Sequence, residues 1–246
     1  MSLYFISDLH LQTDKPCITQ GFVSYIAALP DDAEALYILG DFFEYWVGDD
    51  DRNDLIDQVQ TTLSALKKRG VTLYFQHGNR DFLLGKQYAD RCGMTLLDEE
   101  HVIDYDGTRY LLMHGDSLCT SDTEYMAFRQ QSRNPEWQAM MLSLSLEERH
   151  ALAKNVRDTS QTETRMKADD ITDVTQAAVE ERMRANDVQQ LIHGHTHRPK
   201  QHEFNLSESS ATRHVLGDWS DTNGWDIRLS ANGVVLNKFA HTDHTS

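Results

Sequence analysis

The sequence is poor in cysteine, in long apolar runs and in positive charge, and each shortage excludes a class of protein. Cys17, Cys92 and Cys119 are an odd number without metal-type spacing, so we expect reduced, structural thiols and no disulfide framework. No stretch approaches about eighteen apolar residues, which argues against a membrane-spanning helix. Asp8, a candidate metal ligand, lies too close to the start for a signal peptide to precede it, so we expect a cytosolic protein.

The shortage of positive charge bears on the partners of the protein. The formal net charge is -16 at pH 7, with 39 acidic and 23 basic residues. We expect no nucleic-acid partner, because affinity for a duplex comes largely from basic side chains that neutralise phosphates. An anionic substrate is compatible with this charge if bound divalent ions supply local positive charge. The length of 246 residues fits one large α/β domain, or a core with an inserted subdomain.

Candidate metal ligands follow five short apolar runs, which read as buried strands at residues 3–6, 35–39, 71–75, 110–113 and 190–192. The ligands, in chain order, are Asp8, His10, Asp41, Asn79, His114, His195 and His197. In open α/β sheets, ligand-binding residues collect at one edge, beyond the ends of the strands. The sequence therefore predicts that the five strand ends converge on one site.

The chemistry of these ligands predicts a pair of transition-metal ions. Mixed carboxylate, imidazole and carboxamide ligands suit Mn²⁺, Fe²⁺, Zn²⁺ or Co²⁺, whereas Mg²⁺ and Ca²⁺ sites are mostly oxygen. Seven ligands are too many for one catalytic ion with an open position, but they suit two ions that share a carboxylate, for which Asp41 is the natural choice. An isolated Asp-x-His or His-x-His pair would be weak evidence. The ordered series predicts a two-metal phosphoesterase.

The strand pattern is interrupted in the middle of the chain. Strands alternate with helical patterns up to about residue 118, and capping boxes at Ser121-x-x-Glu124 and Ser145-x-x-Glu148 then indicate helix starts. The β pattern resumes at Val188, with a hairpin turn at Asn232-Gly233. We expect a single α/β domain over residues 1–246, with a helical insert at residues 120–187.

The predicted insert contains an unusually apolar stretch after Pro135. Its members are Trp137, Met140, Met141, Leu142, Leu144 and Leu146. Packing between the helices of the insert is the default interpretation. The alternative is a groove for a lipid or a partner, since methionine-rich surfaces adapt to flexible apolar ligands.

With these ligands, the sequence resembles the calcineurin-like metallophosphoesterases, whose motifs are D-x-H, G-D, G-N-H-D or G-N-H-E, a lone His, and G-H-x-H. Arg80 stands where most members have a histidine. G-N-R-D, together with I-S-D-L-H-L, I-L-G-D-F-F-E-Y-W-V-G-D-D, M-H-G-D-S-L-C-T and L-I-H-G-H-T-H-R-P, is similar to the pyrophosphohydrolase family of lipid A biosynthesis. The likeness covers nearly the whole chain and weakens after about residue 200.

The resemblance implies a fold, an activity and a location. The fold would be a four-layer αββα metallophosphatase sandwich, with the insert as a helical cap over acyl chains. The substrate would be a glycolipid nucleotide, a UDP-linked diacylated glucosamine, whose pyrophosphate is hydrolysed to UMP and lipid X. The protein would be cytoplasmic and peripherally associated with the inner membrane, through the insert, with no obligate protein partner.

The resemblance also implies residue roles. One Mn²⁺ would be held by Asp8, His10, Asp41 and His197, and a second by Asp41, Asn79, His114 and His195. The expected substrate contacts are Asn79, Arg80, Asp122, Ser160, Thr164, Lys167 and His195, of which Asn79, Arg80 and His195 are the expected catalytic residues.

Arg80 can offer a phosphate a planar fork of donors, although a salt bridge with Asp81 or Asp116 is the alternative for it. We expect His77 and His193 to support the neighbouring ligands or to pack. We expect a solvated loop at residues 49–51, with a role near the metals as the alternative. Two other functions stay open at this point. One is a related enzyme acting on a soluble substrate, and the other is a noncatalytic scaffold of the same fold.

Overall fold

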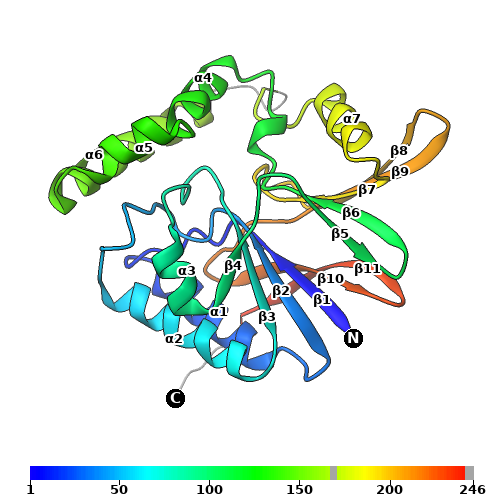
Figure 1. The fold of residues 1–246 in the computed structure, drawn as a ribbon, viewed down its shortest axis with the longest axis horizontal. Helices are drawn as coiled ribbons and strands as arrows, with labels where there is room; N and C mark the ends of the chain where they lie inside the picture. The colour runs from blue at the N-terminus through cyan, green and yellow to red at the C-terminus, as the bar shows by residue number, and fades with distance from the viewer. Residues whose placement is uncertain (167–170, 242–246) are drawn as a thin grey trace.

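Two β-sheets lie face to face at the centre of the molecule (Figure 1). The computed structural model describes residues 1–166 and 171–241, with side chains described for residues 1–157 and 171–241. The first sheet contains β1 (Ser2–Ile6), β2 (Ala33–Leu39), β3 (Thr72–Gln76), β4 (Met94–Leu96), β10 (Asn223–Ser230) and β11 (Gly233–Ala240). The second contains β5 (His101–Tyr105), β6 (Thr108–Leu112), β7 (Gln190–His193), β8 (Lys200–Leu206) and β9 (Ser209–Val215). The strand orders are β11-β10-β1-β2-β3-β4 and β5-β6-β7-β9-β8.

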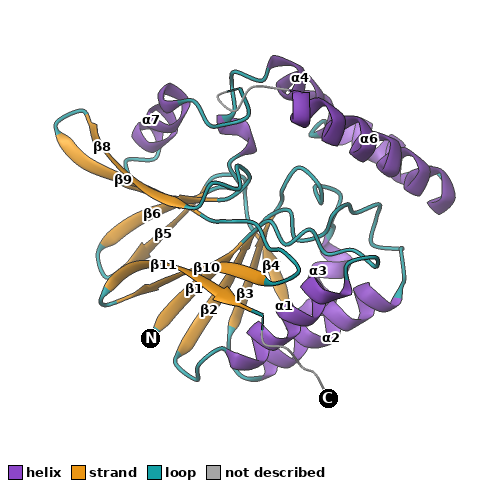
Figure 2. Ribbon diagram, turned by 180° about the vertical axis from the view of Figure 1, so that it is seen from behind, coloured by secondary structure: helices purple, strands orange, loops and turns teal. Residues whose placement is uncertain are grey.

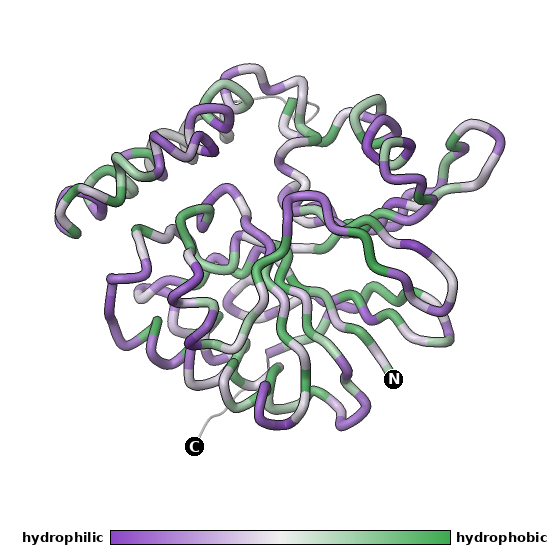
Figure 3. The backbone as a smooth tube through the Cα atoms, in the orientation of Figure 1, coloured by the Kyte–Doolittle hydropathy of each residue, from purple (hydrophilic) through white to green (hydrophobic). Residues whose placement is uncertain are grey.

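The central strands are apolar on both faces because each face meets a different core. In β2, Ala35, Tyr37 and Leu39 face the core between the two sheets, whereas Leu36 and Ile38 face the helices on the other side. Strands covered on both faces read as continuous apolar runs, which is the pattern seen in the sequence. Figure 3 shows the same runs as green segments along the strands of the body, as we call the two sheets and the helices that cover them.

Helices cover the outer faces of both sheets. On the first sheet lie α1 (Pro16–Ala28), α2 (Asp54–Lys68) and α3 (Lys86–Cys92). On the second sheet lies α7 (Gln176–Ala185), whose Val179 and Met183 pack with Leu111 and Leu191. The sequence sets the start of α2, where Asn53 accepts a hydrogen bond from the amide of Ile56 at 3.0 Å. The layers therefore run helix, sheet, sheet, helix, and the predicted αββα sandwich is confirmed.

The remaining helices form a layer of their own beyond the carboxyl ends of the strands (Figure 2). We call α4 (Thr123–Ser132), α5 (Pro135–Leu142) and α6 (Leu146–Met166) the cap. Because α7 packs on the second sheet, it lies outside the cap, and an inserted unit over residues 120–187 stays a prediction.

The structure tests the two predicted capping boxes. At the start of α6, Glu148 accepts from the amide of Ser145 at 2.9 Å, and its own amide donates back to the Ser145 hydroxyl at 3.3 Å, so this box is confirmed. The box at Ser121 is wrong. Asp122, one residue later, caps α4 by accepting from the amide of Tyr125 at 3.0 Å. A carboxylate next to the serine is an equally good N-cap, and the spacing alone could not separate them.

Candidate active site

All seven candidate ligands lie just beyond the carboxyl ends of strands, where the two sheets meet the cap. The strands β1, β2 and β3 run parallel, and so do β6 and β7, so their following loops emerge at the same edge. Backbone hydrogen bonds tie the first two loops together. The amide of Asp8 donates to the carbonyl of Gly40 at 3.1 Å, and that of His10 donates to Asp41 at 3.0 Å. The predicted convergence of five strand ends is confirmed.

The ligands form two groups. Asp8, His10 and His197 make one, and their ligand atoms lie within 4.8 Å of one another. Nε2 of His197 is 3.3 Å from Nε2 of His10 and 3.5 Å from Oδ1 of Asp8. His197 is exposed, whereas Asp8 is buried, so the group opens towards solvent on one side. A substrate could therefore reach an ion held there.

Asp41, His114 and His195 make the second group, again with ligand atoms within 4.8 Å of one another. Oδ1 of Asn79 lies between the two rings, 3.0 Å from Nε2 of His114 and 2.9 Å from Nδ1 of His195. Asp41 faces both groups, because its Oδ1 is 3.6 Å from His114 and its Oδ2 is 4.0 Å from Nε2 of His10. Asp41 thus occupies the position expected of a bridging carboxylate.

The hydrogen bonding of His114 shows that this group fits a cation. Nδ1 of His114 lies 2.8 Å from the carbonyl oxygen of Leu39, to which only an N–H can donate. In the neutral ring, Nε2 then carries a lone pair and faces oxygen atoms of Asn79 and Asp41. Three acceptor atoms converge on one place, which is the arrangement a divalent ion stabilises.

The backbone at the site is held in a sparsely populated conformation. Among the described residues, eight non-glycine residues have positive φ, and five of them are candidate ligands. These five are Asp8 (φ 57°), His10 (φ 50°), Asp41 (φ 49°), His195 (φ 69°) and His197 (φ 55°). Asp and His tolerate this left-handed region better than bulky residues, and such strain clusters at functional sites. The surrounding hydrogen bonds therefore hold the ligands in place at a conformational cost.

Glycines in the motifs allow the loops to approach closely. A Cβ on Gly78 would lie 2.2 Å from the backbone nitrogen of Asp41, and one on Gly194 would lie 2.3 Å from Oδ2 of Asp8. Neither position can accept a side chain without moving a candidate ligand. The G-N and G-H parts of the motifs are thus required by close packing at the site.

In the metal-free site, the pKa values of two candidate ligand histidines are shifted in opposite directions. Burial would lower the pKa of His197, but the carboxylate of Asp8 raises that pKa to about 9. Burial, reinforced by neighbouring His114, lowers the pKa of His195 to about 4. Burial would raise the pKa of Asp8, yet the surrounding histidines, His197 first, hold it below its usual range. At neutral pH, His195 is therefore neutral and Asp8 is an anion, as metal binding requires, whereas His197 carries a proton that it must lose to bind an ion.

Arg80 is free to meet a ligand. The alternative predicted for it was a salt bridge, but it forms no ion pair with any side chain that the structure describes, and its buried Nε has no partner among them. Asp81 instead accepts from the amides of Gly78 and Phe42, and Asp116 pairs with Arg129. The amide of Arg80 donates to Oδ1 of Asp41 at 2.8 Å, which fixes its backbone beside the ligands.

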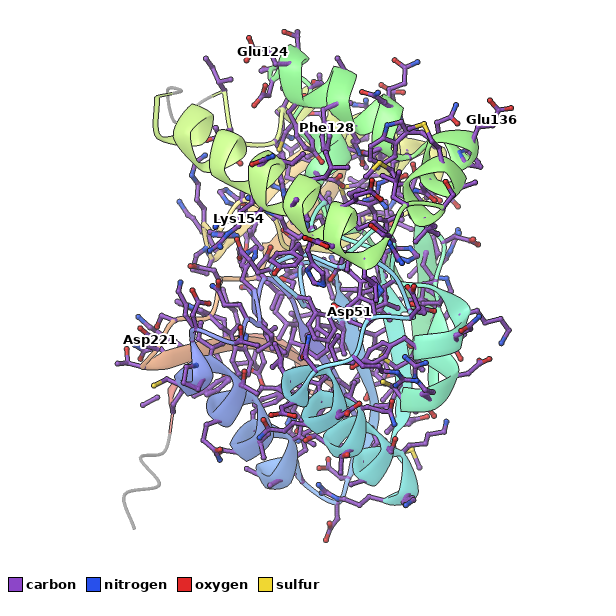
Figure 4. The ribbon with its side chains drawn as sticks, turned by 90° about the vertical axis from the view of Figure 1, so that its left-hand side faces the viewer. Asp51, Glu124, Phe128, Glu136, Lys154 and Asp221 are labelled. Carbon is purple, nitrogen blue, oxygen red and sulfur yellow. The ribbon has the colours of Figure 1, made fainter. Side chains whose placement is uncertain are left out.

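A cavity of about 440 Å³ extends from Asn79 and Arg80 beneath the cap. Its walls are the body residues Tyr45, Trp46, Val47, Phe82 and Leu83, and the cap residues Phe128, Trp137, Met140, Met141, Leu144, Arg149, Leu152, Ala153 and Val156. Figure 4 labels Phe128 among the cap helices and Asp51 in the loop below α6. No residue of α5 is buried, so the default expectation of a self-contained apolar core is wrong for this helix. Four members of the apolar stretch, Trp137, Met140, Met141 and Leu144, line a cavity instead.

The acidic run at residues 49–51 holds structure together, and the expectation of a solvated loop is wrong. Asp49 accepts from the amides of Gly85 and Tyr88, at the start of α3. Asp50 forms a bidentate pair with Arg149, and Asp51 lies 3.2 Å from Nε2 of His150. Two of the three carboxylates therefore attach α6 of the cap to the body.

A buried carboxylate that the sequence motif did not assign anchors the other end of the cap. Asp116 accepts hydrogen bonds from the hydroxyl of Tyr125 at 2.6 Å and from Nε of Arg129 at 2.9 Å. Arg133 donates to the carbonyl oxygen of Gly78 at 2.9 Å, next to Asn79. Asp116 begins a short 3₁₀ helix, Asp116–Leu118, after β6, and a buried charge there needs partners, which was the available signal.

The other expected substrate contacts have mixed positions. Asp122 is the N-cap of α4. Ser160 and Thr164 belong to α6, but their side chains lie outside those described, and Lys167 lies outside the described residues. His193 is buried and 3.2 Å from Arg213, and His77 contacts the carbonyl oxygen of Leu84 at 2.7 Å.

Known proteins share this arrangement of motifs. The sequence pattern of the calcineurin-like phosphoesterases matches residues 1–199, a span that contains both ligand groups and the cap. The chain belongs to this family. Membership implies a site for two divalent ions, for which the two groups described above are the candidates.

Two proteins with similar sequences are both named UDP-2,3-diacylglucosamine hydrolase. A UDP-2,3-diacylglucosamine hydrolase of Chromohalobacter salexigens is 51% identical over 229 residues, covering 93% of each chain. One of Cellvibrio japonicus is 50% identical over 236 residues, covering 96% of this chain and 98% of the relative. The solved structure of an archaeal phosphodiesterase is 12% identical, with a TM-score of 0.49, and covers 98% of this chain and 99% of that one. The resemblance predicted from the motifs is confirmed by the two hydrolases.

Proposed function

We propose that this protein hydrolyses the pyrophosphate bond of UDP-2,3-diacylglucosamine, a step of lipid A biosynthesis that yields UMP and lipid X, which is 2,3-diacylglucosamine 1-phosphate. The names of the relatives support the substrate. The observation that carries the proposal is the apolar cavity that ends at Asn79 and Arg80, beside the ligand groups. In this substrate the glucosamine ring carries the acyl chains on one side and the pyrophosphate on the other, which matches an apolar cavity that leads to polar ligand groups.

We propose two Mn²⁺ ions as the cofactors. Asp8, His10, Asp41 and His197 would hold one ion, and Asp41, Asn79, His114 and His195 would hold the other. When bound, such ions would lower the pKa of the attacking water and offset the charge that develops on the phosphoryl oxygens. The mixture of imidazole and oxygen donors supports manganese or a similar ion over magnesium.

The chain's own residues would bind and orient the phosphates. Arg80 offers a planar fork of donors at the cavity end, and it forms no ion pair with a described side chain, although its charge acts on the nearby carboxylate of Glu44. The separation of 2.9 Å between Oδ1 of Asn79 and Nδ1 of His195 supports the proposal that both residues contact the same phosphate. Asp122, Ser160, Thr164 and Lys167 remain proposed contacts from the cap side.

We propose peripheral contact with the cytoplasmic face of the inner membrane, where a diacylated substrate would lie. Within residues 1–166 and 171–241, no helix combines the length and apolar character needed to cross a bilayer. The cap exposes Met140, Leu142, Leu152 and Val156, with 54%, 43%, 39% and 45% of their surface accessible. Three of the four also line the cavity, so the surface offered to lipid leads into the proposed binding site.

The test is manganese-dependent release of UMP from UDP-2,3-diacylglucosamine in water enriched in ¹⁸O. We expect turnover that depends on the added ion, with ¹⁸O in a single product. UDP-glucose is the matched control, because it has the pyrophosphate but no acyl chains to fill the cavity. If the acylated substrate is inert while UDP-glucose or simple phosphodiesters are cleaved, the lipid assignment fails.

A further inference from the structure

A buried carboxylate, Glu44, lies between the cap and a candidate metal ligand. Its Oε1 accepts a hydrogen bond from Nε of Arg157 on α6 at 2.6 Å. Its Oε2 is 3.2 Å from Nδ1 of His10, whose Nε2 faces His197. The side chain of Glu44 is only 7% exposed. One carboxylate therefore touches both a cation of the cap and a ring that would bind an ion.

Arg157 also contacts the loop that carries His10. Its Nη2 donates to Oε1 of Gln12 at 3.0 Å, and Gln12 follows His10 by two residues in the same loop. A single guanidinium thus bridges the loop after β1 and the loop after β2, which carry His10 and Glu44. Because its fork is planar and rigid, the two contacts fix one relative position of the cap and these loops.

The two groups of ligands differ in what orients their rings. His114 in the second group is held by the carbonyl oxygen of Leu39, at the end of β2. For the ring of His10 in the first group, the described residues supply no such backbone partner. Its buried Nδ1 makes no well-aligned hydrogen bond with any described residue, and the close contact with Glu44 is the one available to orient it. The ring of His10 is therefore positioned by side chains that depend on the cap.

We propose that Glu44 and Arg157 are positioning residues that couple docking of the cap to ion binding at the His10 group. This inference rests on the metal assignment proposed above. Carboxylates that orient a metal-binding histidine typically change metal affinity by about 10–100-fold. By linkage, docking of the cap strengthens binding of that ion, and the ion in turn stabilises the docked cap by the same factor. The ring of His114 in the second group is anchored on strand backbone and lies outside this coupling.

The test measures Mn²⁺ binding to the metal-free protein, with free and bound ions distinguished by electron paramagnetic resonance. For Glu44→Gln, which keeps the shape of the side chain, we expect one of two ions to bind about 10–100-fold more weakly. The coupled two-ion signal should then give way to a single-ion signal at intermediate Mn²⁺. For Arg157→Ala we expect the same ion to weaken, but not when Glu44→Gln is already present, because the two act through one contact.

Arg149→Ala is the matched control. Arg149 ties the same helix to Asp50 but touches no candidate ligand, so its effect on ion binding should be smaller and should add to that of Glu44→Gln. Hydrogen exchange gives the reciprocal readout. Mn²⁺ should slow exchange in α6 of the unaltered protein, and it should do so less in Glu44→Gln.

Two failures are distinguishable. If the unaltered protein takes up no divalent ions, the proposed metal centre is wrong. If it takes up two ions and Glu44→Gln binds both equally well, or if the effects of Glu44→Gln and Arg157→Ala simply add, the coupling is wrong while the metal centre stands. Metal-free unfolding temperatures of each variant identify any loss of folding.

Discussion

The metal centre and the cap occupy neighbouring space, yet they are built from different kinds of interaction. Each candidate ligand of the metal centre follows its strand within a few residues, so the sheets themselves deliver it to the site. The cap is attached by contacts between residues far apart in sequence, 99 positions for Arg149 with Asp50 and 113 for Arg157 with Glu44. The centre is thus a property of the sheets, whereas the cap is a docked layer that can be perturbed separately.

Removal of a metal ligand should lower turnover more than any other change and should leave the fold intact. For His195→Ala we expect turnover to fall by about 10³-fold or more, since ion catalysis supplies several kcal/mol of transition-state stabilisation. The layers keep their cores, so the cooperative unfolding transition should persist. Steady-state turnover with saturating Mn²⁺, together with circular dichroism, checks both parts. Full activity with added Mn²⁺ would contradict the site assignment.

Arg80 stands at the boundary of the two regions. For Arg80→Ala we expect turnover to fall by roughly 10²-fold, the usual effect of losing one donor to a developing negative charge. The content of bound manganese should change little, because Arg80 presents no ligand atom. Elemental analysis beside kinetics measures the two effects. Loss of manganese comparable to the loss of turnover would show that Arg80 is structural.

Changes in the cavity should act on the acylated part of the substrate. For Met141→Asp we expect KM for UDP-2,3-diacylglucosamine to rise by about tenfold or more, because a carboxylate in an apolar cavity is poorly solvated. Met141→Leu, which roughly conserves volume, should stay close to the unaltered protein. A comparison of KM across substrates of different acyl length measures the effect. Equal KM values in both variants would indicate that the acyl chains bind elsewhere.

Loosening of the cap should have the smallest effect. Asp50 is more than half exposed, and ion pairs of that kind contribute about 1 kcal/mol at most, so Asp50→Ala should raise KM by about fivefold at most. Arg149→Ala should raise KM further, because Arg149 is buried and also donates to the carbonyls of Val47 and Leu144. The double variant should be no worse than Arg149→Ala alone. Additive losses would mean that Arg149 acts mainly through its bond to the carbonyl of Val47.

The same contrast explains how much was predictable from sequence. Apolar runs with Asp, Asn or His at their ends predicted the strands and the convergence of the ligands, because both signals are local in the chain. The polar strand β8 and the three-residue β4 carry no such pattern and were missed. The roles of Glu44, Asp116 and Arg157 depend on partners from distant segments, so no local spacing in the sequence predicts them. For the same reason, the sequence alone predicts a solvated loop at residues 49–51, whereas in the folded protein two of these carboxylates contact α6 of the cap.

The left-handed backbone at five of the candidate ligands has a consequence for how the protein meets its ions. The folded loops hold these residues in a costly conformation, so much of the cost of shaping the coordination sphere would be met by folding and not by ion binding. Ligands fixed in this way would favour an ion whose preferred geometry they match.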